Sequence, residues 1–230
     1  MVEQAGGVLK TNYRFNSGFF EGCIRSIDSD SPELVGQEAV IAEDIRKKLK
    51  KQDRVVLVDL GAMFAASAFV IAKHFEPEIK TGRITVIASN REKFNPEVPI
   101  DAAKETAHWN KHQPIYPDMP TLEFIKRNLV LVRFANDIDS SHLYQELHLR
   151  NIGPADIIHE NFGGLFHVPV TNGRNALNGV IRALKSGGIL FTTETPCSDT
   201  QKYGDSVDID LIPDEEYYRG GPGYRRYRKK

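Results

Sequence analysis

The chain has 230 residues, of which 40% are hydrophobic and 27% are charged, and its formal net charge is −1. These values are typical of one globular domain with or without extensions, and the small net charge excludes a global attraction to nucleic acid or membrane. The longest apolar stretches are too short to span a membrane, and the N-terminus lacks the pattern of a secretory signal. Two distant cysteines, Cys23 and Cys197, give no disulfide framework, so we expect a cytoplasmic protein.

The N-terminal part divides into an arm and a helix. Residues 1–36 include four aromatic side chains between positions 12 and 21. We expect them to form an arm packed on the domain, and a flap over a ligand is the alternative. Residues 32–51 predict a helix, because apolar residues recur along the segment and a basic run suits a helix C-terminus.

Residues 54–72 read as a buried strand, a tight turn and a buried helix. Val55–Val58 is an apolar run with three β-branched residues, as in a strand covered on both faces. Asp59 and Gly61 follow at the point where this strand ends, and an apolar helix is predicted over 62–72. Such a turn exposes backbone N–H groups that can contact a ligand.

The pattern of strand followed by helix continues along the chain. Further strands are predicted over 82–88, 129–135, 155–160 and 189–193, with helices over 101–112, 140–150 and 172–185 and an edge strand over 207–212. This alternation predicts an α/β fold, a doubly wound and mostly parallel sheet with helices on both faces. In such sheets ligands bind beyond the carboxyl ends of the strands, where the strand order reverses.

Two motifs carry a resemblance to a known family. Val56-Leu-Val-Asp-Leu-Gly61 supplies an acidic residue, a spacer and a glycine at the end of the first strand, and Leu184-Lys-Ser-Gly-Gly-Ile-Leu-Phe191 precedes and enters the fifth. With the order of elements over residues 37–194, these motifs resemble the class I S-adenosylmethionine-dependent methyltransferases. The resemblance implies that fold, that cofactor and a methyl acceptor that the sequence does not identify, whether a small molecule, a protein or an RNA.

The resemblance also implies cofactor-binding positions at the strand ends. They comprise the first turn, the end of the second strand for the ribose, the end of the third for adenine, and the residue that closes the fourth: Asp59, Gly61, Ala62, Met63, Ser89, Asn90, Asn136, Asp137 and Glu160. The family usually has glycine at the positions of Met63 and Ala65, and a carboxylate where Ser89 and Asn90 stand. These departures favour the alternative of a non-catalytic binding or scaffold protein. A nicotinamide dehydrogenase needs Gly-x-Gly-x-x-Gly at the first turn, where only Gly61 is present.

The catalytic candidates follow the fourth strand. Glu160, His159 and His167 lie in a stretch that is faintly similar to a loop of the protein arginine methyltransferases. A carboxylate or imidazole there could take a proton from the acceptor during methyl transfer. The alternatives are a loop carboxylate that caps a neighbour and ordinary histidines.

Three segments remain open. Residues 91–120, with five prolines, form either a lid or a rigid insertion of the domain over 37–213. His108 and His112 have the spacing of a metal-binding pair on a helix, although Trp109 between them favours packing. Residues 214–230 are a basic, aromatic tail that is disordered or contacts single-stranded nucleic acid.

Overall fold

The structure is a computed structural model, and it describes residues 36–60, 66–90, 122–133, 141–160, 164–165, 168–193, 196, 199–204, 210–214 and 225–230. Its strands are β1 (Val55–Leu60), β2 (Ile84–Asn90), β3 (Leu129–Arg133), β4 (Ala155–Glu160), β5 (Leu184–Thr192), β6 (Leu211–Pro213) and β7 (Arg225–Lys229). Its helices are α2 (Gly36–Leu49), α3 (Ala66–His74), α4 (Glu76–Lys80), α6 (Leu122–Asn128), α7 (His142–Leu149), α8 (Gly173–Ala183) and α9 (Thr200–Tyr203), with a 3-10 turn η1 (Val170–Asn172).

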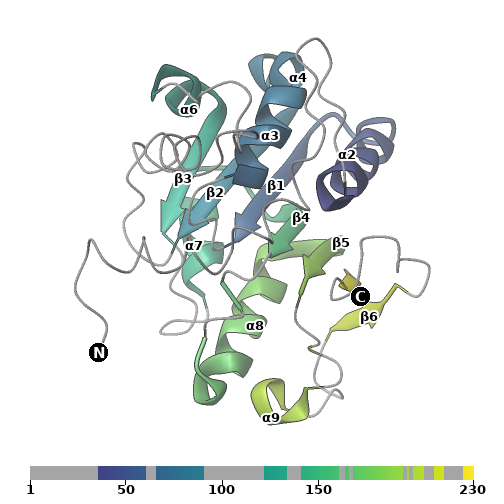
Figure 1. Ribbon diagram of the computed structural model, residues 1–230, viewed down its shortest axis with the longest axis vertical. Coiled ribbons are helices and arrows are strands. Elements are labelled where there is room, and N and C mark those ends of the chain that lie inside the picture. The colour runs from purple at the N-terminus through teal and green to yellow at the C-terminus, as the bar shows by residue number, and fades with distance from the viewer. Residues whose placement is uncertain are drawn as a thin grey trace, which may run out of the picture.

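The strands form one sheet in the order β3-β2-β1-β4-β5-β7-β6 (Figure 1). The four strand pairs within β3-β2-β1-β4-β5 are parallel. Strand β7 runs antiparallel to both β5 and β6. The chain passes from β1 outward to β3 and then returns to the other side of β1 as β4, so the strand order reverses between β1 and β4. The predicted fold class is confirmed, and the β1–β4 junction is where such sheets bind ligands.

Each face of the sheet carries its own hydrophobic core. One core joins alternate residues of the central strands to α2, α3 and α6, and the other joins the intervening residues to α7, α8 and α9 (Figure 1). All six residues of β1 are buried, which explains its continuous apolar run with a single acid, Asp59. Among the described helices, none has the length and apolarity needed to cross a membrane.

Several elements have boundaries that differ from the predicted ones. The prediction for 155–160 coincides with β4, whereas β2 continues through Ser89 and Asn90, which pair with Leu60 and Arg133. The predicted helix over 172–185 ends earlier, at Ala183, because Leu184 is already extended and begins β5, where it pairs with Ala155 of β4. The glycines expected to stop that helix lie inside β5 instead, at an irregularity in its pairing with β4: Ala155 pairs with Leu184, but Ile157 pairs with Ile189.

The predicted tail is corrected by the structure, because residues 225–229 form β7 and pair with β5. Tyr227 is buried in the core beside α8, and Lys229 Nζ donates to the carbonyl oxygens of Ile181 and Leu184, each at 2.7 Å. Basic residues can enter a sheet when their charges find acceptors of this kind. The predicted arm before residue 36, the predicted lid with its histidine pair, and residues 215–224 lie outside the described residues.

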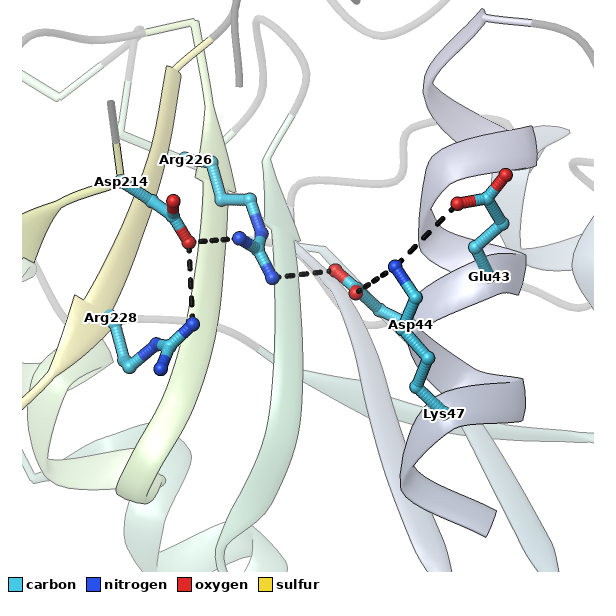
Figure 2. A network of polar contacts seen from close by, with 6 residues as sticks. All are labelled: Glu43, Asp44, Lys47, Asp214, Arg226 and Arg228. Atoms are coloured by element: carbon cyan, nitrogen blue, oxygen red, sulfur yellow. Dashed lines mark hydrogen bonds and ion pairs between the residues drawn. The ribbon is translucent and has the colours of Figure 1, made fainter. Parts of the chain in front are cut away.

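An ion network holds β7 against α2 (Figure 2). The guanidinium of Arg226 lies between two carboxylates: Nη2 is 3.0 Å from Asp44 Oδ2, and Nη1 bonds Asp214. Arg226 and Asp44 have side-chain exposures of only 10% and 6%. Asp214 also contacts the more exposed Arg228 at 3.4 Å, and Lys47 lies 3.9 Å from Asp44. The network therefore joins α2, β7 and the residue after β6 at nearly buried positions.

We expect Arg226→Met to destabilise the domain by about 3–5 kcal/mol, because it leaves Asp44 and Asp214 buried without their shared cation. Arg228→Met is the matched control: it lies on the same strand and contacts the same Asp214, but its side chain is 57% exposed. The control substitution should lower the free energy of unfolding by no more than about 1 kcal/mol. Urea unfolding measures both, and equal losses would show that burial of the network does not matter.

Candidate functional site

The carboxyl ends of β1 and β4 bring polar residues together at the point where the strand order reverses. Asp59 pairs in register with His159, and Leu60 pairs with Glu160. Paired residues of parallel strands point to the same face, and successive residues point to opposite faces. Asp59 and His159 therefore share the face covered by α2 and α3, whereas Glu160 belongs to the face covered by α7 and α8.

Asp59 joins three elements through its own atoms. Its Oδ1 lies 3.2 Å from His159 Nδ1, and its Oδ2 accepts a hydrogen bond of 3.1 Å from the backbone N–H of Ala68 in the first turn of α3. Its carbonyl oxygen accepts a bond of 3.1 Å from Ser89 Oγ. Asp59 is 5% exposed and His159 is fully buried. This carboxylate consequently holds β1, β4 and α3 in one arrangement.

Glu38, in the first turn of α2, completes the cluster on this face. Its Oε1 accepts a hydrogen bond of 2.7 Å from Ser67 Oγ on α3, whereas its Oε2 is buried and has no hydrogen-bond partner. The residue is 4% exposed. Burial raises the pKa of Glu38, while the nearby charge of His159 opposes that rise.

Sequence reasoning did not select Glu38, although a signal was present. Glu38 lies three and seven positions before Ile41 and Ile45, both of which are buried in the core. Residues at these spacings share one face of a helix, so the acid belongs to the buried stripe. An acid on such a stripe indicates a polar interaction inside the protein.

The charge of His159 is set by the acids around it. Burial alone lowers the pKa of an imidazole, but the hydrogen bond and the charge of Asp59 raise the pKa of His159, and Glu38 and Glu160 act in the same direction. The net direction is upward, so the imidazolium form is favoured and Nδ1 donates to Asp59. The predicted catalytic histidine is thus a buried partner of Asp59.

Glu160 stands apart on the other face. It is fully buried, and its Oε2 accepts hydrogen bonds from Thr192 Oγ1 at 2.7 Å and Thr193 Oγ1 at 3.3 Å. Both threonines come from the carboxyl end of β5 and the residue after it. His159 and Glu160 are adjacent in sequence, but successive side chains of a strand point to opposite faces of the sheet. The two residues therefore have different partners.

The remaining predicted positions fall into two groups. Ser89 is fully buried, and its hydroxyl bonds Asp59, while Asn90 is the last residue of β2. The others lie outside the described residues, and their roles stay predictions: Gly61, Ala62, Met63, Asn136, Asp137 and His167. Among the described side chains, no group of three or more His, Cys, Asp or Glu is arranged to hold a metal ion.

Several solved structures are similar to this chain at low sequence identity. No family model matches the chain, and no curated protein matches it. Among solved structures, the O-methyltransferase NovP is 12% identical, with 84% of this chain and 79% of that chain covered and a TM-score of 0.49. A TehB-like SAM-dependent methyltransferase from Corynebacterium glutamicum is 14% identical, with 97% of each chain covered and a TM-score of 0.47. CalS11, a TDP-rhamnose 3′-O-methyltransferase, is 11% identical, with 82% and 77% covered and a TM-score of 0.48.

These similarities are similarities of shape. The strand order defines a doubly wound α/β protein, a fold in which ligands bind where the strand order reverses, and in this chain that point is the β1–β4 junction. The fold is Rossmann-like, of the type that the resemblance to class I methyltransferases implied. What the chain does with that fold has to be argued from its own residues.

The raised pKa of His159 gives stability a definite pH dependence. A histidine whose folded pKa exceeds its ordinary value of 6.5 stabilises the protein fully below that value, and the contribution is lost as pH rises through the folded pKa. The free energy of unfolding of wild type relative to His159→Gln should therefore fall as the pH rises above 6.5, by up to about 1.4 kcal/mol per pH unit for one proton.

Chemical denaturation at a series of pH values measures this difference. The exposed His148 on α7 provides the control variant His148→Gln, which removes a histidine that lies outside the buried cluster. A wild-type advantage over His159→Gln that is constant, or that grows with pH, would contradict a paired imidazolium.

Proposed function

We propose that this protein is an S-adenosylmethionine-dependent methyltransferase whose site lies at the carboxyl ends of β1, β2 and β4. The observation that carries the proposal is the gathering of Glu38 and Asp59 around the buried His159 on one face of the sheet, with the buried Glu160 at the next position of β4, at the junction where the strand order reverses. No requirement of a hydrophobic core accounts for four ionisable side chains there, because buried charges are costly unless they are paired. A ligand site does account for them.

The charge of the cluster fits the proposed cofactor. The cluster has three acidic side chains, Glu38, Asp59 and Glu160, and one imidazole, so acids are in excess. A ligand with cationic centres would offset this excess in a poorly solvated site. Bound S-adenosylmethionine supplies a methyl group on a positively charged sulfur. Asp59, Ser89 and Asn90 are the described residues that would hold it, together with the predicted positions outside the described part.

Glu160 is our candidate for contact with the methyl acceptor. Two threonine hydroxyls donate to the same oxygen, Oε2, and so hold the carboxylate in one orientation at the end of β4. A fixed carboxylate can orient an acceptor O–H or N–H for in-line attack and take its proton. The acceptor is a small molecule, a protein or an RNA that carries such a group.

One observation favours the second candidate, a non-catalytic binding or scaffold protein. Both carboxylate oxygens of Asp59 are bonded to His159 and Ala68, and the hydroxyl of Ser89 bonds the Asp59 carbonyl. Two of the predicted cofactor contacts are thus engaged within the protein. A scaffold would keep these bonds for stability and would bind no adenosyl ligand.

Calorimetry separates the two candidates. We expect S-adenosylmethionine and S-adenosylhomocysteine to bind with micromolar dissociation constants, and NAD not to bind. No binding of any of the three would support the scaffold, and binding of NAD alone would contradict the proposal.

A pair of variants places the site. Asp59→Asn should weaken binding of S-adenosylhomocysteine by about 1–3 kcal/mol, because it removes a charge and rearranges the bonds to β4 and α3. Asp156→Asn is the matched control: Asp156 is also a buried acid, 1% exposed, but it lies near the amino end of β4 and bonds Lys185 at 2.9 Å. The Asp156→Asn variant should bind S-adenosylhomocysteine with the affinity of the wild type.

A further inference from the structure

The position of Glu38 is fixed by contacts within the protein. It lies on the buried stripe of α2, is 4% exposed, and is anchored through Oε1 to Ser67 on α3. The anchor fixes the carboxylate between the two helices that cover the Asp59–His159 side of the site. A long side chain held in this way has already lost its rotamer freedom, as a preorganised binding group does.

The second carboxylate oxygen of Glu38 is the unusual feature. Oε2 is buried and has no hydrogen-bond partner. Its charged surroundings are His159 on β4, which attracts it, and Asp59 on β1, which repels it. His159 acts on Glu38 through its charge and donates no hydrogen bond to Oε2. Native proteins seldom leave a buried acceptor without a donor, since its lost hydration is not recovered.

We propose that Oε2 of Glu38 binds the primary ammonium group of the ligand, which for S-adenosylmethionine is the amino group of its amino-acid end. The inference rests on the proposed function, and it adds a binding residue on α2 that the strand-end pattern does not predict. Three facts support it: the oxygen lacks a donor, the carboxylate is held rigidly by Ser67, and the acids of the cluster outnumber its one imidazole.

The chemistry of the oxygen selects the ligand group. In the ionised form, which the charge of His159 favours, the carboxylate of Glu38 only accepts hydrogen bonds, so the ligand must donate. A neutral hydroxyl would satisfy the hydrogen bond but leave the negative charge without compensation. An ammonium group supplies both a donor and a positive charge, and charge-assisted bonds of this kind are roughly twice as strong as neutral ones.

A comparison of two ligands with two proteins tests the assignment. The ligands are S-adenosylhomocysteine and its deamino analogue, in which hydrogen replaces the amino group, and the proteins are wild type and Glu38→Gln. Calorimetry should show wild type binding the deamino analogue at least about 10-fold more weakly. Glu38→Gln should bind the two ligands with affinities within about threefold, because the charged partner of the amino group is gone.

Two further variants keep the test sharp. Glu43→Gln removes an exposed acid of the same helix, with a side-chain exposure of 61%, and should retain the full wild-type preference for the amino group. Ser67→Ala removes the anchor of Glu38 without changing the charge, and should reduce the preference. Thermal unfolding shows whether each variant folds. If Glu38→Gln does not fold, Ser67→Ala replaces it in the test.

The outcomes distinguish this inference from the proposed function. If wild type binds S-adenosylhomocysteine but Glu38→Gln keeps the whole preference for the amino group, Glu38 does not bind it, while the proposed function stands. Equal binding of both ligands by wild type has the same meaning. If wild type binds neither ligand, the proposed function and the inference are both overturned.

Discussion

The ion pair between Asp59 and His159 is the interaction on which the rest of this site depends. It crosses from β1 to β4 at the junction where the sheet changes winding direction, and both side chains are buried. A lone carboxylate or imidazolium at that depth would be strongly destabilising, so each requires the other. Because Asp59 also accepts the N–H of Ala68, the same pair fixes the first turn of α3. Because both side chains are buried, their bonds fix how β1, β4 and α3 are arranged at the junction.

Helix α2 connects this junction to the far edge of the sheet. Glu38 in its first turn bonds Ser67 near the Asp59–His159 pair, and Asp44, six residues later, bonds Arg226 of β7. Six residues of helix span about 9 Å. The C-terminal strand therefore helps to hold the helix that carries Glu38, even though β7 lies beyond β5 in the sheet. A basic segment at the end of the chain becomes part of the scaffold that supports the site.

Much of this arrangement could be predicted from the sequence, and the failures have physical reasons. The apolar runs of β1 and β4 and the glycines before Phe191 suffice for the fold class, because strands buried on both faces leave a strong pattern. The same pattern places Asp59 at a strand end. Strand β7 is not evident from its own sequence, because the charge of Arg226 is compensated by Asp44 and Asp214, which lie outside the strand.

The site itself was only partly predictable. The sequence offers His159 and Glu160 together as catalytic candidates, but the two-residue period of a strand directs their side chains to opposite faces. Ser89 and Asp59 were expected to face a ligand, but their bonds to each other and to His159 depend on the register of three strands, which local sequence does not specify. Glu38 was overlooked because an acid near a helix N-terminus is ordinarily explained by solvent and the helix dipole.

The most direct measurement is a crystal structure of the protein with S-adenosylhomocysteine. The account predicts that the ligand lies across the carboxyl ends of β1, β2 and β4, with its amino nitrogen within hydrogen-bond distance of Glu38 Oε2 and the Asp59–His159 pair intact. A ligand at any other edge of the sheet, or one whose amino group points away from Glu38 while Oε2 stays buried without a partner, would contradict it.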